Sequence, residues 1–585
     1  MDENRASTYF VRRSSVFVHS IKHKINRIFD YTAEKIYRKA YSNFSGLSEF
    51  FISVLYGLCI LHSAIEIIFI KEKIMASQTI IILVTVFVYM AAMIAIGFKF
   101  SNQNNTAGDF YLGGRKLGPF VTAMSAEASD MSSWLLMGLP GVALAGALGS
   151  QVGYIEAVWT AIGLAVGTYL NFLLVAKRLR RYSEEIKADT IPDYFSNRFN
   201  DKSGILTLIC ALIIIVFFVP YTASGFSGVG KLFESLFGLD YHISMIIGAA
   251  IICIYTTLGG FLAASTTDFI QSIIMTIALF AIVGFCISDS GSLSASLSSA
   301  GAIKGYFNWT GADGSYGALP IASTLAWGLG YFGMPHILLR FMAIKDDKKL
   351  KTSRRIASVW VVISMAIAIF IGVIGVNFAA NHNLAEELGD SFDAERIIIY
   401  IANEFSTHSW ILAVIAGLIV SGIMASIMST ADSQMLAASS SMSENIVRRF
   451  FWKNMSTKAS MILARVMVVI ITVVAVFFAW DSESSVFRIV SFAWAGFGAT
   501  FGPIMLLSLF WKRCNKYGAI AGLCVGGAMV FIWKFVIASL GGVFAIYELL
   551  PAFVANLIVC VIVSLVTPKP EEEVIATYEK VKAMK

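Results

Sequence analysis

The chain has 585 residues, of which 57% are hydrophobic and 14% are charged, and its net charge is +7. Soluble domains carry about 25% charged residues, so this composition excludes an ordinary water-soluble protein. The basic residues fall in short segments between apolar blocks rather than on one face, which argues against a nucleic-acid partner. Seven scattered cysteines without a Cys-x-x-Cys pair indicate neither metal nor redox chemistry.

The first 74 residues form a basic extension. Residues 1–45 are weakly amphipathic, which is typical of a helix that lies on an anionic membrane surface. Residues 50–70 are long and apolar enough for an extra span, although they carry His62 and Glu66. The alternative is that Met75, which opens a good first transmembrane segment, is the true start of the protein.

Apolar blocks of about 18 residues or more, the length that crosses about 30 Å of hydrocarbon, recur along the chain. We therefore predict an all-α polytopic membrane protein with about 13–14 transmembrane helices. The predicted spans are 50–70, 77–98, 119–146, 152–176, 204–230, 241–260, 268–288, 318–342, 356–380, 408–438, 459–480, 486–510, 518–539 and 545–566.

Basic loops alternate with acidic ones. The segments 177–181, 345–355, 448–458 and 512–516 are rich in Lys and Arg, and an even number of predicted crossings separates each from the next. Positive charge resists translocation, so this side is expected to be cytoplasmic, together with the C-terminal tail 568–585. The loops at 381–395 and 481–483 on the opposite side are acidic.

The densest polar interruption of a span is Ser125–Ser133. Serine and aspartate side chains compete for backbone hydrogen bonds, so we expect the helix to break here. A broken helix in lipid is tolerated only where its free backbone groups line a cavity. The alternative, a serine-rich packing interface, explains the serines but not Glu127 and Asp130.

A second polar segment, Ser426–Gln434, places oxygens on one helix face. The Ser429 hydroxyl and the Ser426 carbonyl are three residues apart, and Thr430 is adjacent. Sodium prefers oxygen ligands, so this cluster, completed by carbonyls of Ala128 and Met131 from the broken helix, is a candidate ion site. Helix packing is the alternative.

Two further spans are interrupted by Gly and Pro, at 220–225 and 327–336. Such residues loosen helices near cavities, and the aromatic rings of Trp327 and Tyr331 are suited to an apolar substrate ring. The alternative for these aromatics is a place in the core or facing lipid. His336 is expected to be a core histidine.

These segments resemble the sodium/solute symporter family, in particular its bacterial proline-transporting members. The resemblance runs from about Met75 to near Thr567 and does not reach the extension. It implies the leucine-transporter-like fold of two five-helix inverted repeats, here about 119–288 and 318–510, within a membrane domain at 75–567. The similar stretches are 109–120, 129–141, 190–195, 259–263 with 267–268, 327–337, 428–430, 491–498 and 501–503.

The resemblance also implies functional residues. For sodium these are the carbonyls of Ala128, Met131 and Ser426 and the hydroxyls of Ser429 and Thr430; Ser426 replaces a family alanine. Asp130 and Asp268 match carboxylates on which sodium-dependent transport depends. For the substrate the resemblance points to Ser132, Ser133, Trp134, Tyr221, Trp327, Tyr331, Pro335 and Gly417. Ser133 and Glu127 stand where the proline-transporting members have glycine, and both add polar bulk at the expected pocket.

The expected function is therefore sodium-coupled import of L-proline across the bacterial inner (cytoplasmic) membrane by alternating access. The alternative is sodium- or proton-coupled symport of another small amino acid or a carboxylate. No His-Glu-x-x-His motif indicates an intramembrane enzyme, and 568–585 is too short for a folded signalling domain. We expect no cofactor; the partners are sodium as the coupling ion, the substrate and the bilayer.

Overall fold

The computed structural model describes residues 77–101, 106–148, 153–311, 314, 316–384, 386 and 392–584. The predicted extension 1–74, with its span at 50–70, lies outside these residues. In the described part of the chain every regular element is a helix, and the β-type pairing there is a single bridge between Leu117 and Ile344. The prediction of an all-α membrane protein is confirmed.

Ten helical stretches of the described residues are long and apolar enough to cross a membrane. Their outer faces carry exposed apolar side chains such as Val88 (62% exposed) and Val359 (61%), as a lipid environment requires. They are α3 (Ser77–Ser101); α7 (Gly153–Leu170) with η4 (Asn171–Ala176) and α8 (Lys177–Glu185); α10 (Ile205–Phe237); α11 (Tyr241–Asp289); η6 (Asp347–Lys349) with α16 (Leu350–Asn381); α19 (Trp410–Ser440) with η9 (Ser441–Phe451); α20 (Thr457–Phe478); α21 (Val486–Phe510); α22 (Lys516–Ile532) with η10 (Trp533–Ile537) and η11 (Ala538–Leu540); and α23 (Leu549–Val566).

Helix α11 contains two of the predicted spans, 241–260 and 268–288. The Tyr255 hydroxyl hydrogen-bonds to the Thr267 hydroxyl, although twelve residues of straight helix would separate them by about 18 Å. The chain therefore turns back between them. The turn is at Gly260, whose φ of 62° is in the region that glycine adopts without strain. Two antiparallel spans thus form one helical hairpin.

Two other spans are broken in the middle. Helix α5 (Pro119–Ala128) ends at Ala128, residues 129–132 are not helical, and the chain continues as η2 (Trp134–Gly138) and α6 (Leu139–Ala145). The predicted break in Ser125–Ser133 is therefore present. Likewise α14 (Ala318–Leu325) and η5 (Ala326–Phe332) are separated from α15 (Pro335–Ala343). Pro335 has no N–H to continue the ladder.

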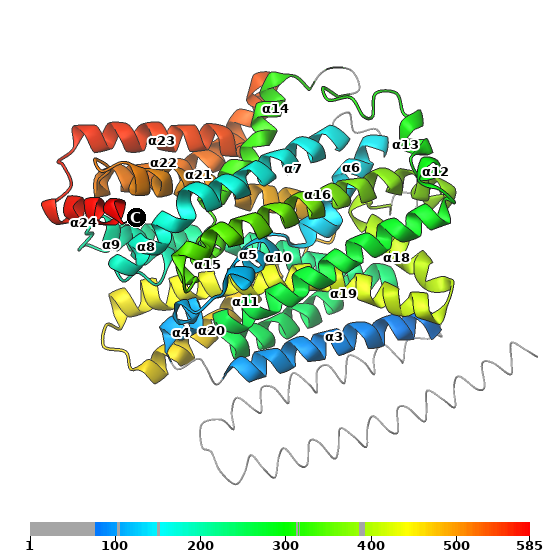
Figure 1. Ribbon diagram of the computed structural model, residues 1–585, viewed down its shortest axis with the longest axis horizontal. Coiled ribbons are helices and arrows are strands. Elements are labelled where there is room, and N and C mark those ends of the chain that lie inside the picture. The colour runs from blue at the N-terminus through cyan, green and yellow to red at the C-terminus, as the bar shows by residue number, and fades with distance from the viewer. Residues whose placement is uncertain are drawn as a thin grey trace, which may run out of the picture. The chain divides into compact units, whose positions relative to one another are not determined.

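The basic loops lie on one face of the helical bundle. The Arg180 guanidinium donates to the Ile344 carbonyl at 2.7 Å, which joins α8 to the end of α15. The C-terminal helix α24 (Glu572–Ala583) reaches the same face, where Lys580 pairs with Glu185 at 2.5 Å. Figure 1 shows α8, α9 (Ile191–Arg198) and α24 gathered at one end of the long helices.

Other loops meet on the opposite face. The Tyr241 hydroxyl donates to the Ala479 carbonyl at 2.8 Å, and the Asn377 amide donates to the Ser290 hydroxyl at 3.1 Å. The contacts of the described loops thus divide them into two groups, one at each face, in the alternating order predicted from the charges.

Candidate ion and substrate site

Four of the five predicted sodium ligands meet where the end of α5 contacts α19. The Ser429 hydroxyl donates to the Ala128 carbonyl at 2.8 Å and lies 3.2 Å from the Ser426 carbonyl. The Thr430 hydroxyl lies 3.4 Å from the same Ala128 oxygen. In a continuous helix the Ser132 amide would bond to Ala128, but here it bonds to the Asp130 carbonyl. The helix break therefore leaves this carbonyl free for α19.

The fifth predicted ligand, Met131, lies three residues further along in the non-helical segment and is fully buried. Its amide bonds to the Glu127 carbonyl at 2.9 Å, and the Ser364 hydroxyl lies 3.5 Å from its sulfur. No hydrogen bond among the described residues joins the Met131 carbonyl to the other four oxygens. Its role as a ligand stays a prediction.

The Asp130 carboxylate lies in the same break and is only half satisfied. The Tyr331 hydroxyl donates to its Oδ2 at 2.8 Å, while Oδ1 is buried and has no hydrogen-bond partner among the described residues. Its backbone carbonyl accepts hydrogen bonds from the Tyr221 hydroxyl at 3.1 Å and from Trp134 Nε1 at 2.9 Å. Because a buried carboxylate oxygen without a partner is unfavourable, Oδ1 is where a cation or a ligand donor is expected.

Aromatic rings cover the break. The Trp134 and Trp327 rings are 6.5 Å apart, and Tyr331 packs edge-on against Trp494 at 5.0 Å. Trp494 Nε1 donates to the Trp327 carbonyl at 2.7 Å, which holds η5 against α21. Trp494 is in the stretch 491–498 quoted above, but it was not predicted as a site residue, since nothing local distinguishes it from a packed core tryptophan.

Glu127 and Ser133, which stand where the proline-transporting members have glycine, contact different helices. Glu127 Oε2 accepts a 3.4 Å hydrogen bond from Thr168 in α7, and its Oε1 is buried without a partner among the described residues. Ser133 faces Gly228 of α10, where a Cβ would lie 3.1 Å from the Ser133 Cβ. The Gly228 backbone therefore makes room for the extra serine side chain.

The other predicted substrate residues are placed differently. The Ser132 hydroxyl lies 3.4 Å from the Trp134 amide, at the start of the second half-helix, and Pro335 opens α15. Gly417 lies near the beginning of α19, where a Cβ would come within 2.6 Å of Thr85 in α3. The structure therefore groups Gly417 with a helix–helix contact rather than with the residues around Asp130.

Asp268 is part of a buried network that sequence reasoning found only in part. It accepts hydrogen bonds from the Ser125 hydroxyl at 2.6 Å and from Arg340 Nη2 at 3.2 Å, and both charged residues are at most 1% exposed. Arg340 Nη2 also donates to the Ser433 hydroxyl at 2.5 Å, and Ser433 donates to the Ser429 carbonyl at 2.9 Å. Hydrogen bonds thus lead from Asp268 to the ion-site segment of α19.

Arg340 was missed because it lies five residues before the basic loop 345–355 and looks like part of it. The signal that distinguishes it is its place within an apolar helix, since a charge there is expected to have a function. Asp432 is a second carboxylate that Arg340 influences electrostatically. The ion pair of Arg340 is with Asp268, while Asp432 lies within reach of its charge.

The site is closed toward the face with the acidic loops. Lys231 of α10 pairs with Asp393 at 2.9 Å and with Glu395 at 3.3 Å, and the Glu395 carboxylate accepts the amides of Val486 and Phe487 at the start of α21. Burial alone would raise the pKa of Asp393, but the Lys231 ammonium outweighs it and the pKa lies below its usual value. The stabilisation from the Lys231–Asp393 pair is complete above about pH 4 and is lost as the pH falls through the lowered pKa of Asp393.

The site is closed toward the basic face as well. Arg115 donates to the carbonyls of Met342 and Ala188, each at 2.7 Å, and its neighbour Leu117 forms the bridge with Ile344. Trp327, at 4%, is the most exposed of the site side chains near Asp130. The structure is therefore an occluded arrangement, in which neither face gives access to these residues.

Comparisons with known proteins identify relatives of this chain. Residues 110–526 match the model of the sodium:solute symporter family. The osmoregulated proline transporter OpuE of Bacillus subtilis is 41% identical over 496 residues, which cover 84% of this chain and 96% of that protein. The sodium/proline symporter of Haemophilus influenzae is 42% identical, covering 85% and 97%, and that of Escherichia coli is 41% identical, covering 83% and 93%.

A solved structure also matches. A sodium-coupled sialic acid symporter in a substrate-bound, outward-open state aligns with a TM-score of 0.70 over 84% of this chain and 99% of that one, at 20% identity. At this identity the likeness shows the shared fold. The expected leucine-transporter-like fold is confirmed, while the exact limits of its two repeats stay a prediction.

Proposed function

We propose that this chain, which belongs to the sodium:solute symporter family, imports L-proline by coupling it to sodium entry. The family and these relatives are transporters, so the chain is not an enzyme, as predicted. The observation that carries the proposal is the cluster of buried oxygens of Ala128, Ser426, Ser429 and Thr430 beside the unpartnered Oδ1 of Asp130.

The oxygen cluster suits sodium. Two carbonyls and two hydroxyls give neutral oxygens, which are the ligands that hard cations take. The cluster is also divided between two elements, since Ala128 ends α5 and Ser429 lies in α19. A cation held by both would therefore tie the broken helix to α19, and its departure would free them to separate.

The surroundings of Asp130 suit an amino acid with an apolar ring. At neutral pH proline carries a carboxylate and a secondary ammonium, and the unpartnered oxygens of Asp130 and Glu127 are acceptors for that ammonium. The rings of Trp134 and Trp327 offer apolar surface for the pyrrolidine. Glu127 adds a further buried carboxyl oxygen as an acceptor, which favours a substrate with a cationic N–H group over a simple carboxylate.

A second candidate is another small amino acid. The Ser133 side chain and Glu127 occupy space where the proline-transporting pattern has glycine, so the pocket is more polar than that pattern expects. An ammonium group is common to all amino acids, whereas the fit of the ring is not. The competition experiment below distinguishes the two candidates.

Coupling follows from the shared elements. Sodium that orders the break beside Ser429 also orders Asp130, two residues from Ala128, so sodium raises the affinity for substrate. By thermodynamic reciprocity the substrate raises the affinity for sodium by the same factor. Alternating exposure of the occluded site to the two faces then moves both ligands together down the sodium gradient.

The chain is a multi-pass bacterial membrane protein. We assign the basic face, with α24 on it, to the cytoplasm because loops rich in Lys and Arg stay on that side. The pairing of Lys580 with Glu185, which joins α24 to α8, supports the same side for the C-terminus. The membrane is then the bacterial cytoplasmic membrane.

Purified protein in proteoliposomes is expected to take up radiolabelled L-proline when an inward sodium gradient is imposed. Replacing external sodium by potassium should reduce the initial rate to that of protein-free liposomes. Unlabelled amino acids added in excess identify the better substrate, since the true one competes most strongly. Uptake that proceeds equally in potassium would contradict sodium coupling.

Ser429→Ala is expected to raise the sodium concentration for half-maximal uptake about tenfold or more, because it removes one ligand oxygen from a charged ion. The apparent affinity for proline should fall with it at low sodium. Ser439→Ala is the matched control, since Ser439 lies further along the same helix, where its hydroxyl donates to the Leu436 carbonyl. An unchanged sodium dependence in Ser429→Ala would remove this residue from the site.

A further inference from the structure

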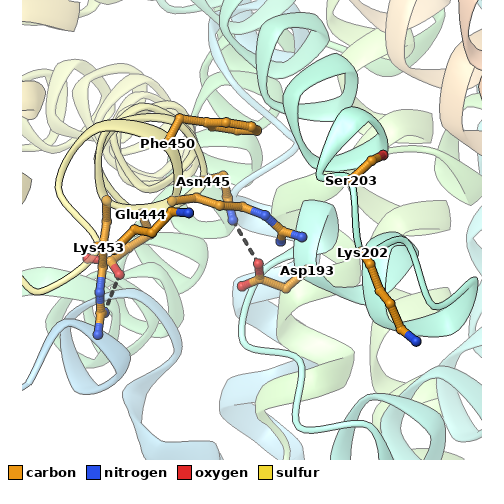
Figure 2. A pocket seen from close by; sticks show the side chains of 9 residues that line it. Asp193, Lys202, Ser203, Glu444, Asn445, Phe450 and Lys453 are labelled. Carbon is orange, nitrogen blue, oxygen red and sulfur yellow. Dashed lines mark hydrogen bonds and ion pairs between the residues drawn. The ribbon is translucent and has the colours of Figure 1, made fainter.

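A cavity of about 580 Å³ opens on the basic face, away from the site around Asp130. It lies between η9, at the end of α19, and the segment that joins α9 to α10. Its volume is within the range of small-molecule sites. Figure 2 shows Lys202 and Ser203 on one side of it and Glu444 and Lys453 on the other.

The lining is basic. Four cationic side chains, Lys202, Arg448, Arg449 and Lys453, face two acidic ones. Both acids are already engaged: Glu444 pairs with Arg448 at 2.6 Å, and Asp193 accepts a 2.9 Å hydrogen bond from Asn445 (Figure 2).

The two lysines are not engaged. Among the described residues no hydrogen bond or ion pair involves the ammonium group of Lys202 or Lys453, and both side chains are exposed. Arg449 is held in place, since its Nη2 donates to the Ser196 hydroxyl at 3.0 Å. The cavity thus presents positive charge without a protein counter-ion.

An acceptor inside the cavity lacks a donor. Asn445 is 1% exposed, and its Nδ2 donates to Thr190 and Asp193, which fixes the orientation of the amide. Its Oδ1 is buried and has no hydrogen-bond partner among the described residues. A ligand that carries both an anionic group and a hydroxyl would satisfy the lysines and this oxygen together.

The rim is aromatic and exposed. Phe450 lines the cavity at 38% exposure, and the residues after it, Phe451 and Trp452, are 80% and 53% exposed. Aromatic side chains at the end of a membrane helix are typical of the headgroup level of the bilayer. The cavity therefore lies where lipid headgroups are.

We propose that this cavity binds a phosphate group on the cytoplasmic side, with the headgroup of an anionic phospholipid such as phosphatidylglycerol as its source. Basic pockets between membrane helices on this side are suited to such headgroups. The bound phosphate joins the α9–α10 segment to the end of the helix that carries Ser429. Free phosphate shares the chemistry, and the experiment separates the two sources.

The test uses the full-length protein in neutral detergent and follows thermal unfolding by tryptophan fluorescence. Short-chain phosphatidylglycerol, short-chain phosphatidylcholine and inorganic phosphate are titrated separately at constant ionic strength. The pocket variant is Lys202→Gln with Lys453→Gln. The control is Lys348→Gln with Lys351→Gln, which removes two exposed charges from the same face but outside the cavity.

Phosphatidylglycerol is expected to raise the Tm of the parent protein by about 2–4 °C and phosphatidylcholine to leave it unchanged. The phosphatidylglycerol concentration at half of the full Tm shift should rise about 25-fold in the pocket variant, because each lysine contributes about fivefold to the affinity for an anionic headgroup. It should stay unchanged in the control. Because both lysines are exposed and unpaired, the Tm without lipid should match that of the parent.

Equal titrations for the parent, pocket and control proteins, or equal effects of the two lipids, would overturn the proposal. The titration with inorganic phosphate distinguishes a lipid headgroup from free phosphate as the bound group. A rise in Tm with inorganic phosphate that the pocket variant loses supports a site for the free anion, whereas a rise with phosphatidylglycerol alone supports the lipid headgroup.

Discussion

Asp130→Asn is expected to lower the initial rate of sodium-driven uptake by about 10- to 150-fold. The substitution keeps the size of the side chain and its bond with Tyr331 but removes the charge from the unpartnered Oδ1. An interaction with a charged partner contributes about 1.5–3 kcal/mol to binding, and a cation near Oδ1 of Asp130 loses this contribution in the variant. The measurement is uptake into proteoliposomes with matched amounts of protein.

The control is Asp481→Asn, which removes an exposed carboxylate from a loop on the opposite face of the bundle from Arg180. Its uptake should equal that of the parent. If Asp130→Asn transports at the parental rate with the same sodium dependence, Asp130 has no part in coupling. A normal elution profile on size exclusion separates a loss of transport from a loss of fold.

Arg340→Gln is expected to lower the free energy of unfolding by about 3–5 kcal/mol, because it leaves the Asp268 carboxylate buried without its cation. Asp432 loses a nearby positive charge. Asp268→Asn should be milder, since Arg340 then still has Asp432 nearby. Denaturant titration in detergent measures the free energy of unfolding of both variants. The larger loss is expected for Arg340→Gln because Arg340 lies near two buried carboxylates, Asp268 and Asp432.

Arg355→Gln provides the matched control, since it removes an exposed arginine from the following helix and should change stability little. The double variant Asp268→Asn with Arg340→Gln should be more stable than Arg340→Gln alone. In the double variant only Asp432 is left as a buried carboxylate without Arg340, whereas the single variant leaves both Asp268 and Asp432. Equal losses for Arg340→Gln and Asp268→Asn would show that Asp432 does not depend on Arg340.

Much of the fold could be predicted from local sequence. A membrane span requires a long apolar run, and such a run is visible without any knowledge of its neighbours. The break at residues 129–132 follows from serine and aspartate side chains within one turn. The pairing of Ser429 with the Ser426 carbonyl needs only helical spacing. These features depend on residues that are close in the chain.

The partners across the bundle could not be predicted in this way. The Ala128 carbonyl meets Ser429 from 301 residues away, and Tyr331 reaches Asp130 from 201. The family resemblance supplied the first of these positions, but composition and spacing did not. A helix can present any face to its neighbours, and local sequence does not state which one.

Local sequence was enough to predict that this protein crosses a membrane with helices, that one span breaks within Ser125–Ser133, and which oxygens of that break and of a serine-rich helix are candidates for binding an ion. Only the tertiary structure decided that Arg340 is a buried counter-ion rather than part of a basic loop, and that Gly417 packs on Thr85. It also decided that α11 reverses at Gly260. The physical reason is that apolarity and helix breaking act within a few residues, whereas ion pairs and close packing depend on elements that folding alone brings together.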